Sequence, residues 1–276
     1  MVEWSQISRD AVPAVPVSPI EYLPMDIRNV LDEWKDDPYN FTVRLIKGED
    51  GKKKIQIRLD LGILQLEMEG RPDGTKPYDK ESLLDYYLLK LKNTGKDDLS
   101  SNDFSLNREE CDQLRVEAIQ YYHRYISLLE LEDYPGVIAD TEHNLGILDI
   151  LREFAEDKSD MMSYEQYRPY ILMINTISKG RMAMGDEKYD LALKKVKMGI
   201  KLINKAREEL KLVDTHYGSR ELRFLEDWKK DISSELTPSE LEELKKKLDK
   251  AIKMEEYESA ADLRDEINQF KSNRKK

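Results

Sequence analysis

The sequence contains few of the residues on which most catalytic and metal sites depend. Its 276 residues include one cysteine, Cys111, and three histidines, His123, His143 and His216. A single thiol excludes a disulfide within the chain and a zinc site made of cysteines. Cys111 and His123 cannot form a nucleophile pair on one helix, because about three turns separate them.

Long apolar runs and an excess of positive charge are missing as well. No apolar stretch is long enough to cross a bilayer, and no basic segment followed by an apolar run marks a signal peptide. The net charge of −11 disfavours direct nucleic-acid binding, which relies on cations to neutralise phosphates. A mean hydropathy of −0.71 with 37% charged residues suits a helix-rich protein. We expect a cytoplasmic, bacterial protein with no direct nucleic-acid or membrane partner.

Motifs of the common enzyme classes are not found either. The sequence has no glycine-rich phosphate-binding loop and no Gly-x-Ser-x-Gly elbow. Asp140, His143 and Asn144 share a helix face at i, i+3 and i+4, but one Asp and one His fall short of a tetrahedral metal site. We therefore expect no enzyme activity, no catalytic residue, no metal ion and no cofactor.

The first 78 residues predict a proline-rich arm followed by a small α+β segment. Four prolines within residues 1–24 favour extended backbone, either a disordered tail or an arm laid across the body. Residues 25–35 have apolar side chains at helical spacing. Residues 41–59 alternate between apolar and polar around an Asp-Gly turn, which predicts a β-hairpin. Gly62 marks a bulge or the start of a third strand.

Residues 70–74 form a turn-rich loop with two charged side chains, Arg71 and Asp73. Pro-Asp-Gly is common turn chemistry, so a tight turn accounts for this stretch. The alternative is a ligand or partner loop that uses Arg71 and Asp73.

Helical periodicity dominates residues 79–235. The turn at residues 184–193 (MGDEKYDLAL) resembles the Gly-x-x-Tyr-x-x-Ala-Leu turn of tetratricopeptide repeats, with extra residues, and residues 131–139 are a weaker echo of it. This resemblance implies two degenerate repeats over residues 108–212, and the alternative is a plain helical bundle. The strand region and residues 220–232 are candidates to cover the two ends.

Six tyrosines on these helices are candidates to line a peptide groove, because tyrosine presents apolar area with a polar tip. Packing between the helices explains the same pattern. The candidates are Tyr121, Tyr122, Tyr125, Tyr164, Tyr167 and Tyr170. The lysine run Lys194, Lys195, Lys197 and Lys201 is interpreted as a solvated helix face.

The clearest motif lies in residues 236–276. Thr237 followed by Pro238 and Glu240 predicts an N-cap, a first helical position and a capping box. An apolar stripe follows, changes phase near residues 254–257, and continues in a second helix. A helical hairpin of this length rarely folds alone, so it must pack on the chain, on a second copy or on a partner.

Residues 255–267 read EEYESAADLRDEI, which resembles the UVR domain, the helical hairpin found in UvrB and UvrC of bacterial excision repair. The resemblance implies a protein-protein docking module. By this resemblance the partner-binding residues are Leu241, Leu244, Leu248, Tyr257, Ala260, Ala261, Arg264, Asp265 and Ile267.

These patterns predict a mainly α (α+β) chain in four parts: an extended arm (1–24), an α+β segment with a β-hairpin (25–78), a tetratricopeptide-like helical region (79–235) and a UVR-like hairpin (236–276). The favoured function is a non-enzymatic adaptor that binds protein partners through the hairpin and the helical surface. One alternative is an accessory factor of nucleotide excision repair acting through UvrA-, UvrB- or UvrC-like proteins. A second alternative is a small-ligand or metal sensor, and the hairpin is also a candidate for homodimer formation.

Overall fold

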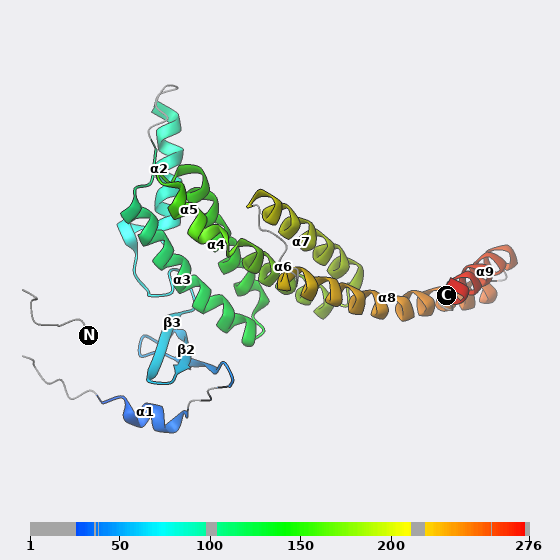
Figure 1. Ribbon diagram of the computed structural model, residues 1–276. Coiled ribbons are helices and arrows are strands. Elements are labelled where there is room, and N and C mark those ends of the chain that lie inside the picture. Colours follow the sequence, from blue (N-terminus) through cyan, green and yellow to red (C-terminus); the bar gives the residue numbers. More distant parts are fainter. Residues whose placement is uncertain are drawn as a thin grey trace, which may run out of the picture.

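The computed structural model describes residues 26–35, 37, 39–97, 104–210, 219–254 and 256–273, and the predicted arm at residues 1–24 lies outside them. The described chain is a small antiparallel sheet joined to a row of helices (Figure 1). The elements in order are α1 (Arg28–Glu33), β1 (Val43–Lys47), β2 (Lys53–Leu59), β3 (Gly62–Glu67), the 3-10 turn η1 (Pro77–Asp79), α2 (Leu83–Asp97), α3 (Arg108–Glu130), α4 (Tyr134–Phe154), α5 (Lys158–Glu165), α6 (Arg168–Gly185), α7 (Tyr189–Glu209), α8 (Arg220–Lys253) and α9 (Tyr257–Asn273). The predicted mainly α class with an N-terminal β-hairpin is confirmed.

The sheet has three strands in the order β1-β2-β3. Ile55 of β2 pairs with Leu45 on one side and Leu66 on the other, and β3 begins at Gly62, so a third strand follows the predicted hairpin. The inner face of the sheet presents Ile55, Ile57 and Leu66, which pack on the helices. These side chains share one core cluster with Tyr125, Leu128, Val137 and Ile174 of α3, α4 and α6. The sheet thereby covers one end of the row of helices.

Two antiparallel helical hairpins form the middle of the chain, α3 with α4 and α6 with α7. Asn107 and Glu110 make a capping box at the start of α3. Glu132 and Glu187 occupy the same place in the two hairpin turns, each with a left-handed backbone (φ 57° and 58°). In both turns the next residue donates a backbone hydrogen bond of 2.8 Å to a helix carbonyl, Asp133 to Leu128 and Lys188 to Ala183.

The hairpins stack through α4 and α6, and α8 then packs on α6 and α7. Residues 164–184 do not form one helix, because α5 ends at Glu165 and α6 begins at Arg168. Pro169 stands in the first turn of α6, where its missing N–H costs nothing. The first part of α8 buries Leu225, Trp228 and Ile232 against this second hairpin.

Helix α8 then continues unbroken to Lys253, so the predicted helix start at Thr237 and Pro238 is wrong. A proline inside a helix removes one backbone donor and clashes with the preceding turn. Packing holds the helix on either side, since Ile232 is buried against the body and Ala251 against α9. The helix therefore crosses residue 235, where the motif was expected to begin.

Gly199 fixes how closely α6 and α7 approach. A methyl group added there would lie 2.1 Å from Thr176 Oγ1 and 2.5 Å from Thr176 Cγ2. We expect Gly199→Ala to destabilise the protein by about 1–3 kcal/mol through overpacking, measured by urea unfolding. Gly185→Ala is the control, because no atom lies within 4 Å of the added carbon. Equal stability of the two variants would show that the hairpin is not close-packed here.

Candidate protein-docking site

The C-terminal hairpin is built by the second part of α8 and by α9. Helix α8 ends at Lys253 with Met254 as its C-cap, and the backbone N–H of Glu256 donates to Ala251 O at 3.0 Å, which closes the turn. Ala251, Ala260 and Ile267 are buried where the two helices meet. The small alanine side chains let the helix backbones approach closely, so α8 and α9 stabilise each other by packing.

The tip of this hairpin exposes three large apolar side chains. Ile252 is 51% exposed, Met254 59% and Tyr257 70%. Figure 1 shows α9 folded back beside the far end of α8, away from the sheet and the other helices. Apolar side chains gathered at one exposed end are typical of an interaction surface, although three of them make only a small one.

The residues assigned by the UVR resemblance fall into two groups. Ala260 and Ile267 are buried and Leu244 and Leu248 are half-buried, so these four serve the seam between α8 and α9. Tyr257, Ala261 and Arg264 are exposed on α9 and are the ones free to meet a partner. Leu241 and Asp265 lie in the two helices, but their side chains are outside the described part of the structure.

A second cluster, which we call the Glu117 network, joins the predicted loop to the helices. Glu117 of α3 is fully buried and accepts hydrogen bonds from Leu83 N (2.8 Å) and Leu84 N (3.1 Å) at the start of α2. The same carboxylate lies 3.1 Å from His143 Nε2 and 3.2 Å from Arg71 Nε. One carboxylate therefore ties together α2, α4 and the loop.

The loop also carries Asp73, which accepts a hydrogen bond from Gln120 Nε2 at 3.0 Å. Burial alone would raise the pKa of Asp73, but hydrogen bonds from Thr75 and Gln120 outweigh it and hold the pKa below its usual value. Arg71 Nη1 donates to Thr75 Oγ1 at 2.8 Å. Both predicted loop residues thus hold the turn onto α3.

Arg124 of α3 also holds the same loop in place. It makes a two-pronged bond to Asp140 of α4 (2.7 and 2.8 Å) and donates to the carbonyls of Glu67 and Gly70. Tyr121 stacks on His143 with ring centres 3.7 Å apart, and burial raises the pKa of its hydroxyl. Arg124 and Asp140 thus pair with each other inside the protein, which is the pattern of a structural polar core.

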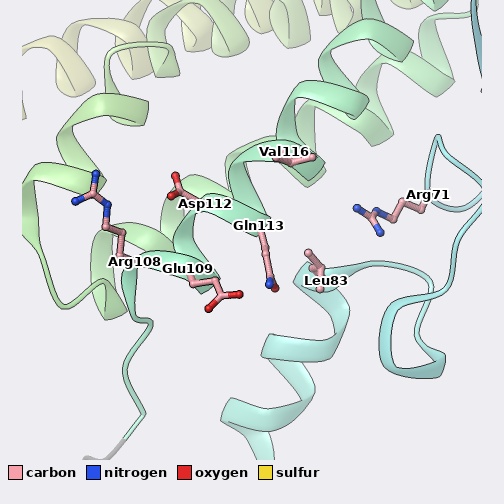
Figure 2. Close-up of a pocket in the computed structure, with 7 residues that line it drawn as sticks. All are labelled: Arg71, Leu83, Arg108, Glu109, Asp112, Gln113 and Val116. Atoms are coloured by element: carbon pink, nitrogen blue, oxygen red, sulfur yellow. The ribbon is translucent and has the colours of Figure 1, made fainter. Parts of the chain in front are cut away.

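A shallow hollow of about 570 Å³ lies beside the Glu117 network, between α2 and the first half of α3. Figure 2 shows Gln113 reaching down from α3 beside Leu83, and Arg71 pointing toward the same space from the other side. The remaining lining residues are Arg108, Glu109, Asp112 and Val116. The lining contains two arginines and two carboxylates, so its formal charges balance and favour neither an anion nor a cation.

The six candidate tyrosines are divided among three places. Tyr122, Tyr125 and Tyr170 lie together near the sheet, with Tyr122 and Tyr125 edge to face at 5.4 Å. Tyr121 belongs to the Glu117 network, and Tyr164 packs beside the cluster formed by α2, α3 and α4. Tyr167 is exposed. The structure thus brings three of the six together, with Tyr125 buried and Tyr122 at the surface.

The helix face of Asp140, His143 and Asn144 is occupied by protein contacts. Asp140 binds Arg124, His143 meets Glu117, and Asn144 Nδ2 donates to Ala118 O at 2.9 Å. Across the described residues no group of three or more His, Cys, Asp or Glu side chains is arranged to hold a metal ion. Nor does the described chain contain a helix with the length and apolarity needed to span a membrane.

The C-terminal hairpin is similar to a known protein family. Residues 238–273 match the family model of the UvrB/uvrC motif. The C-terminal hairpin is a UvrB/uvrC motif. This motif is found in nucleotide excision repair proteins, where it is a protein-protein interaction module. No curated protein and no solved structure matches the chain.

Sequence reasoning missed Glu117, although a signal was present. The residue lies three positions after Leu114 and four before Tyr121, a spacing that places all three on one face of a helix. A carboxylate at such a position must find partners, because an unpaired buried charge is very costly. An acidic residue within an apolar stripe therefore predicts a buried polar network.

Replacing Glu117 tests the network. Glu117→Ala leaves Arg71, His143 and two backbone donors of α2 without their acceptor, and we expect a loss of about 3–5 kcal/mol in unfolding free energy, measured by urea denaturation. Glu109→Ala is the control, since Glu109 is exposed on the same helix. A loss for Glu117→Ala no larger than for the control would mean that the network contributes nothing to stability.

Proposed function

We propose that this protein is a non-enzymatic adaptor whose UvrB/uvrC motif captures a protein partner at the end of the long helix α8. The observation that carries the proposal is the continuity of α8, which runs from the helical body into the motif. The hairpin is thus presented on a helical arm and does not lie against the body (Figure 1). Such a geometry leaves its exposed side free for a partner.

The surface chemistry supports a protein as the ligand. Ile252, Met254 and Tyr257 supply apolar area at the tip, and the adjoining face of α9 adds Arg264. Tyrosine, methionine and arginine are enriched in protein interfaces. Charges around these residues have mixed sign, and an anionic polymer such as DNA would instead select a basic surface.

The test is capture of partners from the native host by full-length protein. Met254→Glu with Tyr257→Glu places two charges in the tip, and we expect it to lose at least one partner that the unaltered protein retains. Phe224→Glu is the matched control, because Phe224 is 50% exposed on the same helix, outside the motif. Identification by mass spectrometry reports which proteins are lost.

Identical partner sets for the two variants would overturn the adaptor role of the hairpin tip. The control also distinguishes loss of docking from a general effect of added negative charge. Helicity measured by circular dichroism verifies that both variants keep their fold.

The second candidate is an accessory factor of nucleotide excision repair, and the motif match at residues 238–273 favours it. In this role the partner is a UvrA-, UvrB- or UvrC-like protein. Titration of purified repair proteins against the full chain separates this role from general adaptor work. Pairing between two copies through the hairpin is a further alternative, and the sedimentation mass of the free protein tests it.

A small-ligand or metal sensor has weaker support. Arg71 and Asp73 make contacts within the loop and with α3, and the hollow beside them has balanced charge. A role as a sensor would require these groups to exchange existing partners for a ligand.

A further inference from the structure

The exposed side of α7 combines charge and apolar area in a way that its lysine run alone did not indicate. Leu191, Met198 and Leu202 are 40%, 55% and 43% exposed, and their spacing of seven and four residues places them along one line of the helix. We call these three residues the α7 seam. They are distinct from Ala192, Val196, Gly199, Ile203 and Ala206, which α7 buries in the body.

Positive charge lies on both sides of the α7 seam. Lys194 and Lys201 are exposed on one side, and Lys195 is exposed on the other. Residues 191–207 contain the cations Lys194, Lys195, Lys197, Lys201, Lys205 and Arg207 and no Asp or Glu. Such a basic segment stands out in a chain of net charge −11. It will attract an acidic partner, which the rest of the surface repels.

The first hairpin shows what covers the matching surface there. Because Glu132 of one turn matches Glu187 of the other, Leu202 corresponds to Ile147 of α4. Ile147 is 1% exposed, since it packs in one cluster with Leu83, Leu84 and Tyr87 of α2. An additional helix thus covers this side of the first hairpin, whereas Leu202 remains 43% exposed on the second.

We propose that the α7 seam is a second docking site, independent of the UvrB/uvrC motif, and that its occupant is an acidic amphipathic helix of a partner protein. The occupant lays its apolar stripe on Leu191, Met198 and Leu202, and its flanking carboxylates meet the lysines. Helix pairs select each other by this combination of an apolar seam with charged flanks.

The apolar seam distinguishes this ligand from two other polyanions. Phosphate contacts of a nucleic acid call for cations and polar donors, and they would leave three apolar side chains unused. An anionic membrane would meet a protein whose remaining surface is strongly acidic, and that surface is repelled by acidic lipid.

The test uses full-length protein and a fluorescent synthetic helix of leucine and glutamate heptads, followed by anisotropy. We expect saturable binding that weakens as salt is raised, and about tenfold weaker binding by Lys194→Glu with Lys201→Glu. Lys245→Glu with Lys247→Glu is the control, since both lysines are exposed on α8, and it should bind as the unaltered protein does. The charge-matched peptide with lysine in place of glutamate should not bind the unaltered protein.

Absence of binding by the acidic peptide, or equal binding by the two double variants, overturns the proposal. Lysine-dependent binding of a DNA duplex or of phosphatidylserine vesicles in place of the peptide also overturns it. Met254→Glu with Tyr257→Glu should bind the peptide normally, so failure of this site and failure of the hairpin site are distinguished. Met198→Gln should weaken binding as well, because it removes apolar contact without changing the charge, whereas a purely electrostatic contact would leave binding unchanged.

Discussion

Three connections between helices in the described chain are closed by the same kind of backbone hydrogen bond, which joins residues five positions apart. Asp133 N donates to Leu128 O, Lys188 N to Ala183 O and Glu256 N to Ala251 O, at 2.8, 2.8 and 3.0 Å. Each bond closes the turn between two antiparallel helices, and in the first two turns the residue before the donor, Glu132 or Glu187, has the left-handed backbone of a Schellman motif. In each turn the residue that accepts this bond is buried, and so is the fourth residue of the next helix: Val137, Ala192 and Ala260.

This recurrence relates the UvrB/uvrC motif to the body of the protein. The motif is the last of three hairpins that share this hydrogen bond, and a tyrosine begins the second helix of each: Tyr134, Tyr189 and Tyr257. The paired apolar residues become smaller along the chain, from Leu128 and Val137 to two alanine pairs. Smaller side chains at this position allow the helices to lie closer, while Ile252, Met254 and Tyr257 of the motif stay exposed at its tip.

Much of this architecture follows from periodicity. Alternation predicted the strands and three-four spacing predicted the helices, because burial on one face is required wherever an element packs on a core. Asn107 with Glu110 marked a real cap, whereas Thr237 with Pro238 did not. The two signals look alike in sequence, but packing on both sides of Pro238 keeps α8 continuous, and local propensity contains no information on that packing.

The candidate site was less predictable than the fold, for a similar reason. The UVR resemblance located the hairpin, but sequence spacing alone could not separate Ala260, which faces α8, from its neighbour Ala261, which is exposed. Arg71 and Asp73 were identified as a pair, yet their partners Glu117 and Gln120 are more than forty positions away. Such long-range pairs arise from the way the sheet folds onto α3, which no local pattern reveals.

The continuity of α8 has a mechanical consequence for any partner held at the hairpin. A helix bends little over its length unless a proline, a bulge or an inserted side chain interrupts it, and α8 contains Pro238 between its two packed parts. The helix is therefore stiff before and after Pro238, and a kink at Pro238 costs less free energy than a kink elsewhere in α8. The α7 seam lies on the body, to which the first part of α8 is packed, so a change of angle at Pro238 would move the hairpin relative to the seam without disturbing either surface.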